Sequence, residues 1–177
     1  QRSPQPVEGY DDPQLSNFYG EALPLVKRGV PVSILHLENT AYTDTWKDVR
    51  VLLLSYSNMK PMDEAQNRNI AQWVSQGGVL IYSGRDKDPF QNVREWWNTG
   101  EKSYKAPSEH LFELMGIPRD AAEGRYEVGR GMVYVIRKDP KEFALAQGAD
   151  KQLLDTVRRA YEDDAKAGKL ELKNSFY

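Results

Sequence analysis

Residues 49–83 constrain the fold more than any other part of this 177-residue chain. Residues 49–56 are apolar almost throughout, which is typical of a parallel strand covered on both faces. Asp63 follows as a helix N-cap, with Gln66 three residues on in a capping-box arrangement. Gly77-Gly78 ends that helix, and residues 79–83 supply a second strand. Strand, helix and strand in this order predict a right-handed βαβ unit, and hence an α/β domain with a mostly parallel sheet between helices.

The flanking segments extend this pattern. We expect further elements in chain order: a helix over residues 12–29 that kinks or breaks near Pro24, a buried strand over 30–37, a helix capped by Ser108 and closed by Gly116, a hairpin of strands 125–128 and 132–137, and an amphipathic helix over 150–167. The sequence thus predicts a flexible N-terminal arm over residues 1–11 and a single α/β domain over residues 12–168. Residues 169–177 are expected to form a C-terminal tail or to begin a β-rich segment.

Composition excludes several classes of function. The formal net charge is −2, so a basic surface for nucleic acid is not indicated. No stretch of 18 or more apolar residues occurs, so no membrane span is predicted. Cysteine is absent, which excludes disulfides, thiolate metal sites and a cysteine nucleophile. No signal peptide is visible, and composition leaves the compartment open.

Polar side chains follow both strands of the βαβ unit. Tyr56 and Asn58 come after the first strand, and Arg85, Asp86 and Asp88 come after the second. In open parallel sheets, ligands bind outside the carboxyl ends of the strands. These five residues, with Trp97 from the long loop that follows, are therefore the candidate ligand-binding residues. Trp96 and Tyr104 of the same loop are interface candidates. The alternative is that these are ordinary polar turns and that both tryptophans pack onto the sheet.

A catalytic site is not predicted. The pair Asp86 and Asp88 could serve a glycoside hydrolase if the two carboxylates stood about 5–10 Å apart, yet a solvated loop explains the pair better. Ser57 and Ser83 lack a Gly-x-Ser-x-Gly elbow. His36 is expected in a buried strand and His110 partly exposed in a helix, so neither is expected to complete a triad.

Metal and cofactor sites are not predicted either. The Asp-x-Asp pattern of residues 86–88 lacks the glycine and the distal glutamate of a calcium loop. No glycine-rich loop for a dinucleotide or a phosphate group follows a strand.

Several of these segments resemble a known family. They are Leu25-Val26-Lys27-Arg28-Gly29 before Val30-Pro31-Val32, the runs 51–54 and 73–81, the helix 111–117 and the glycine hairpin 128–134. The chain is similar here to the glutamine-amidotransferase-like, flavodoxin-like domain of bacterial glycoside hydrolases, of which the β-galactosidase trimerisation domain is one form. The resemblance covers most of residues 15–165 and implies a three-layer α/β/α fold with a sheet like that of class I glutamine amidotransferases.

One departure from the family pattern concerns chemistry. Amidotransferases carry a cysteine in a Gly-x-Cys-x-Gly elbow, whereas this chain has no cysteine and continues from its second strand into Gly84-Arg85-Asp86. The resemblance therefore implies a non-catalytic accessory or oligomerisation domain of a carbohydrate-active protein. Its partners would be neighbouring domains of a larger polypeptide or further copies of the chain, in a periplasmic or extracellular setting. The alternatives are a small-ligand or sugar-binding domain and a stand-alone hydrolase that uses Asp86 and Asp88.

Overall fold

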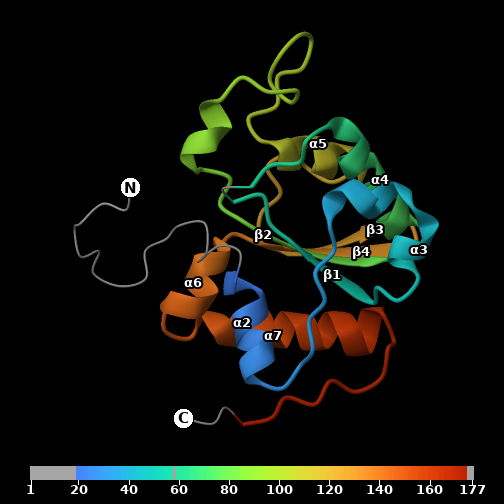
Figure 1. Cartoon of the computed structure of the whole chain (residues 1–177), viewed down its shortest axis with the longest axis vertical. Coiled ribbons are helices and arrows are strands. Elements are labelled where there is room, and N and C mark those ends of the chain that lie inside the picture. The colour runs from blue at the N-terminus through green and yellow to red at the C-terminus, as the bar shows by residue number, and fades with distance from the viewer. Residues whose placement is uncertain (1–18, 58, 175–177) are drawn as a thin grey trace.

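A four-stranded sheet forms the centre of the molecule (Figure 1). The computed structural model describes residues 19–57 and 59–174. The strands are β1 (Val51–Leu54), β2 (Val79–Ser83), β3 (Gly124–Val128) and β4 (Gly131–Ile136), in the spatial order β1-β2-β4-β3. β1 and β4 both run parallel to β2, and only β3 is antiparallel to its neighbour. The expected α/β fold with a mostly parallel sheet is confirmed.

The predicted βαβ unit is present. Helix α4 (Glu64–Ser75) joins β1 to β2, which pair in parallel with Val51 opposite Val79. The Asp63 carboxylate caps α4 by accepting the backbone N–H groups of Ala65 and Gln66, at 2.9 and 3.3 Å. Gly77 ends the helix at φ +124°, a conformation that side chains rarely adopt. These local signals explain why the βαβ unit could be predicted from the sequence.

Helices cover both faces of the sheet (Figure 1). On one face, α4 and α5 (Pro107–Leu114) pack over alternate strand residues such as Leu80 and Tyr82. On the other face, α2 (Ala22–Lys27), α6 (Pro140–Leu145) and α7 (Ala149–Arg159) pack over Val79 and Ile81. Every residue of β2 is buried, as a central strand between two helical layers requires.

Shorter helical turns complete the described chain. They are η1 (Leu37–Ala41) and α3 (Thr43–Trp46) before β1, η2 (Pro89–Asn92) after β2, and a π-helical turn, η3 (Ala160–Asp164), that continues α7. No helix in the described ranges is both long and apolar enough to cross a membrane.

The strand predicted over residues 30–37 is wrong. This segment crosses the molecule without pairing to the sheet, and β1 is the edge strand. Pro31 has no N–H to donate to a ladder, and the Val30 N–H bonds back to the Leu25 carbonyl at 3.0 Å. His36, expected in the core, is exposed. Apolar composition predicted a strand here, but the segment serves as a connector.

The break expected near Pro24 is present: the N-terminal helix is interrupted at Glu21, before α2, because Pro24 has no N–H for the helical ladder. Two further predictions need correction. Pro107, not Ser108, begins α5, and Ser108 is buried within its first turn. The final helical segment ends near Asp164, and residues 169–174 form no strand, although the Lys173 N–H reaches the Arg28 carbonyl at 2.9 Å. The predicted arm and the Asp12-Pro13 cap lie outside the described residues.

Candidate functional site

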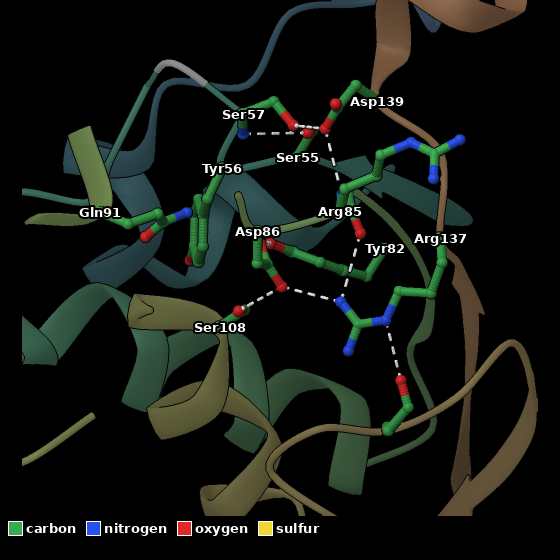
Figure 2. Close-up of polar contacts among 12 residues, drawn as sticks. Ser55, Tyr56, Ser57, Tyr82, Arg85, Asp86, Gln91, Ser108, Arg137 and Asp139 are labelled. Atoms are coloured by element: carbon green, nitrogen blue, oxygen red, sulfur yellow. Dashed lines mark hydrogen bonds and ion pairs between the residues drawn. The ribbon is translucent and has the colours of Figure 1, made fainter. Parts of the chain in front are cut away.

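The carboxyl ends of β1, β2 and β4 meet at one edge of the sheet, because these three strands are parallel. Residues 55–57, 84–88 and 137–139 leave the strands there, and polar side chains from all three segments point toward one another, namely those of Ser57, Asp86, Arg137 and Asp139 (Figure 2). We call this group the carboxyl-end cluster. The predicted site therefore lies where the fold rule for open parallel sheets places ligands.

Asp86 is the centre of the cluster. Its Oδ1 accepts the Tyr82 hydroxyl at 2.6 Å, and its Oδ2 accepts the Ser108 hydroxyl at 2.7 Å and Arg137 Nη1 at 2.8 Å (Figure 2). The Asp86 backbone has φ +54°, which aspartate tolerates better than most side chains. Only 13% of the side chain is exposed. Three donors, one of them the cation Arg137, thus hold this carboxylate in place.

Two buried tyrosines lie under Asp86. Burial raises the pKa of Tyr82 well above its ordinary value, and the neighbouring Asp86 charge raises it further. Burial, and then the Asp86 charge, likewise raises the pKa of Tyr56. The Tyr56 hydroxyl donates to Asn67 Oδ1 at 2.5 Å, within the core. Both phenols therefore stay neutral donors, which suits a structural role and not that of a base.

A second carboxylate joins the loop after β4 to the other two strand ends. Asp139 Oδ1 accepts the Ser57 hydroxyl at 2.7 Å and the Arg85 N–H at 3.1 Å. The Arg85 guanidinium forms a two-bond ion pair with Glu142, at 2.7 and 2.8 Å, which lowers the pKa of Glu142. Ser57 thus donates directly to an aspartate, without the histidine that a triad places between the two, so the arrangement is not that of a triad nucleophile with its base (Figure 2).

Asp88 connects the loops that follow β1 and β2. Its Oδ2 accepts Lys60 Nζ at 2.6 Å and Gln91 Nε2 at 3.2 Å, and its Oδ1 accepts the Phe90 N–H at 3.0 Å to cap η2. Lys60 also donates to the Tyr56 carbonyl at 2.7 Å. The Asp88 carboxylate, like that of Asp86, is therefore occupied by internal donors.

The long loop after η2 is folded onto the molecule by its aromatic residues. Trp97 is 1% exposed, and Trp96 packs edge-on against both Trp97 and His110, while its Nε1 donates to the Pro61 carbonyl at 2.9 Å. Tyr104 is half-buried and bonds to Glu113 through its hydroxyl. His110 is buried, not partly exposed as expected, and contacts Asn67 at 3.1 Å. Trp96 thus fixes the loop to α5 and to the loop after β1.

The predicted site residues fall into two groups. Arg85, Asp86 and Asp88 lie in or beside the carboxyl-end cluster. Tyr56 and Trp97 are buried, so a ligand does not reach them in this conformation. Asn58 lies outside the described residues. The sequence therefore placed the edge correctly, but it could not tell side chains that point outward from those that point into the core.

Several important residues were not among the sequence candidates. Arg137 and Asp139 follow a predicted strand, so the rule that selected Arg85 could have found them if that strand had been placed in the parallel part of the sheet. Lys60 and Gln91 had no motif to mark them. Glu21 was missed too: it accepts a hydrogen bond from the buried Ser83 hydroxyl, and burial raises its pKa to about 7 against the opposing effect of that bond.

An open pocket of about 500 Å³ lies beside the cluster. Its lining residues are Asp86, Lys87, Asp88, Gln91, Asn92, Asn98, Tyr104 and Lys105. Gln91 is 9% exposed, and its Oε1 has no hydrogen-bond partner among the described residues. The volume is within the range of small-molecule sites, and the lining is strongly polar. We refer to this space as the Gln91 pocket.

The described residues contain no cluster of three or more histidine, aspartate or glutamate side chains placed to hold a metal ion. What the site offers chemically is hydrogen bonding and fixed charge.

No protein-family model, no curated protein and no solved structure matches the chain.

Proposed function

We propose that this chain is a non-catalytic accessory domain that works by contact within a larger, carbohydrate-active protein. One observation carries the non-catalytic part: the two carboxylates that could serve a hydrolase, Asp86 and Asp88, are already bound by donors of the chain itself. Asp86 and Asp88 each accept three internal hydrogen bonds and each pairs with a cation. A glycosidase needs one carboxyl free to protonate the substrate and one free to attack or to activate water. The carbohydrate setting rests on the sequence resemblance.

The finer fold is part of the same proposal. Helices on both faces of a parallel β1-β2-β4 core support a three-layer, flavodoxin-like scaffold of the glutamine-amidotransferase type. The antiparallel β3 extends that core on one side only. In such a scaffold the turn after the central strand would bear the nucleophile, and here that turn carries Arg85 and Asp86, both in ion pairs.

Exposed apolar side chains support the contact role. Met59, Met62, Phe90 and Val93 are 44–72% exposed on the loops after β1 and β2, and we call them the loop rim. The Lys60–Asp88 ion pair and the Trp96–Pro61 hydrogen bond hold these two loops together. A fixed apolar surface loses little conformational entropy on association, so it suits a protein interface.

Sedimentation velocity over a dilution series tests the oligomerisation role. We expect the wild-type chain to associate with itself, and the double substitution Met62→Ser with Phe90→Ser to shift it toward monomer. The matched control is Leu145→Ser, which removes an equally exposed apolar side chain from α6, on the other face of the sheet. A wild-type chain that stays monomeric at every concentration contradicts self-association.

A second candidate function is the binding of a small ligand at the carboxyl-end cluster. The Gln91 pocket favours it, because the pocket combines a suitable volume with a buried amide oxygen that no internal group satisfies. An NMR titration with a panel of mono- and disaccharides tests this role. Amide shifts confined to residues 86–105 would support it, and an unchanged spectrum across the panel would contradict it.

A further inference from the structure

We infer that the ligand of the Gln91 pocket is a sugar acid, meaning a small molecule that carries both several hydroxyl groups and a carboxylate. The inference rests on the proposed ligand-binding role of this pocket and names the chemical class of its ligand. Three features carry it: the orientation of one amide, the balance of charge around the pocket, and the internal pairing of Asn98 and Tyr104 in its wall.

Asp88 determines which end of the Gln91 amide is free. The Asp88 carboxylate can only accept, so the Gln91 group at 3.2 Å from it must be the amino group, Nε2. The Lys60 ion pair at 2.6 Å holds that carboxylate in place. The group left over is the carbonyl oxygen Oε1, which is an acceptor. A buried acceptor without a partner is unfavourable by about 1–3 kcal/mol. A ligand hydroxyl therefore finds an acceptor in Gln91 Oε1 when the Gln91 side chain turns toward the ligand.

The charges around the pocket favour an anion. The carboxylates of Asp86 and Asp88 are paired with Arg137 at 2.8 Å and with Lys60 at 2.6 Å. Lys87 and Lys105 also line the pocket, and no ion pair is formed by either in the described part of the chain. The two negative charges are therefore balanced by two cations that are not among the lining residues, and the ammonium groups of Lys87 and Lys105 remain for a ligand. A bound carboxylate would meet them there.

The other wall groups hold the shape of the pocket without competing for the ligand. Asn98 donates from Nδ2 to the Val93 carbonyl at 2.8 Å and accepts the Glu95 N–H at 2.8 Å. The Tyr104 hydroxyl donates to Glu113. Because Asn98 and Tyr104 are paired, recognition falls to the other lining side chains, above all to Gln91 and the two lysines. A neutral sugar would leave the lysines unused, and a simple carboxylate would leave Gln91 Oε1 unsatisfied.

Three probes separate these contributions in an NMR titration that follows the Gln91 side-chain amide. Glucuronate carries hydroxyls and a carboxylate, glucose carries hydroxyls only, and acetate carries a carboxylate only. We expect glucuronate to bind about tenfold more tightly than either of the others. Gln91→Met, followed through neighbouring backbone amides, is expected to weaken glucuronate and glucose alike, and Lys87→Gln with Lys105→Gln to weaken glucuronate alone.

The control pair Lys47→Gln with Arg50→Gln makes the same charge change at exposed positions around a second hollow on the molecule, beside Trp73 and Gly78. It should leave glucuronate binding unchanged. Equal binding of glucose and glucuronate overturns the sugar-acid inference while the ligand-binding role stands. An equal loss in the control pair overturns it too, since the attraction would then be general. No binding of any probe, here or in the wider saccharide panel, overturns the ligand-binding role itself.

Discussion

Asp86 shows how one side chain can organise a strand end. Its backbone lies at φ +54°, where a non-glycine residue is uncommon, and its carboxylate receives Tyr82, Ser108 and Arg137. These donors come from β2, α5 and the end of β4. The residue therefore joins the central strand to two elements that follow it along the chain.

The first prediction concerns Asp86→Asn. Asparagine also tolerates the left-handed conformation, so this change removes the charge and leaves the backbone largely undisturbed. Arg137 then loses its ion-pair partner, and we expect the free energy of unfolding to fall by about 1–3 kcal/mol in urea titrations. Asp44→Asn, at an exposed position, is the control and should have almost no effect. An unchanged stability for Asp86→Asn would show that the carboxylate is not structural.

The second prediction concerns Glu21 and pH. Its pKa of about 7 in the folded protein lies above the ordinary value of 4.5. The folded chain therefore keeps a proton that the unfolded chain has lost, and the resulting stability is full below pH 4.5 and lost as pH rises through about 7. Because Glu21 is only half-buried, we expect a decline of about 1–2 kcal/mol.

Thermal unfolding of wild type and Glu21→Gln between pH 4 and pH 8 measures this effect. The glutamine keeps a hydrogen-bond partner for Ser83 and cannot ionise, so its stability should vary less over this range. Parallel curves for the two proteins would assign the pH dependence to other groups.

At the residue scale, the sequence could identify part of the site. The polarity of Arg85, Asp86 and Asp88 after an apolar run was sufficient to mark a strand end. It was not sufficient to show that Lys60 and Gln91 meet Asp88, since those contacts depend on how two loops fold over one another. The exposure of His36 and the burial of His110 were likewise beyond local pattern, because each depends on packing between distant elements.

At the element scale, helix α4 and the β3–β4 hairpin approach each other very closely. A Cβ atom at Gly131 would stand 1.9 Å from the Val74 carbonyl oxygen and 2.3 Å from that of Gly78. The Arg130 N–H also donates to the Ser75 carbonyl at 2.9 Å. The end of the helix and the start of the strand therefore meet through their backbones, which leaves no space for a side chain.

The third prediction follows from this contact. Gly131→Ala should destabilise the protein by about 1–3 kcal/mol or more, because the obstructing atoms belong to the backbone and cannot rotate away. Gly124→Ala is the matched control in the paired strand: its nearest neighbour, the Tyr126 ring, would be at an ordinary 3.6 Å. Chemical denaturation of both variants distinguishes them, and equal stabilities would contradict the close approach.

Element prediction succeeded where local chemistry and tertiary packing agree. The Asp63 cap, the turn at Gly77 and the apolar run of β2 all indicate the same unit. It failed over residues 30–37, where apolar content indicated a strand but no neighbouring strand pairs with the segment. Leu35 and Leu37 pack partly against the core, while Val32 and Ile34 remain exposed. Local pattern alone could not show that β1 would be the edge of the sheet.

At the scale of the whole molecule, the sheet divides the core into two clusters, and β2 contributes to both. Our fourth prediction concerns amide hydrogen exchange, which we expect to be slowest in β2 and β4. Exchange in β1 should be slower than in solvent-exposed loops. Among the described residues, exchange should be fastest in the connector 30–36. The reason is that β2 and β4 have partners on both sides, whereas β1 lacks one. Protection in the connector equal to that in β2 would contradict the unpaired edge.

The pairing of β2 with β4 has a consequence for the order of folding. Val79 lies opposite Met132, far along the chain, whereas β1–α4–β2 and the β3–β4 hairpin each form from neighbouring segments. Closing the long intervening loop costs conformational entropy before the contacts between β2 and β4 stabilise the pair. The two local units should therefore form early and join late. Substitutions at their junction should then slow refolding less than they speed unfolding, a difference that the two limbs of a chevron plot would measure.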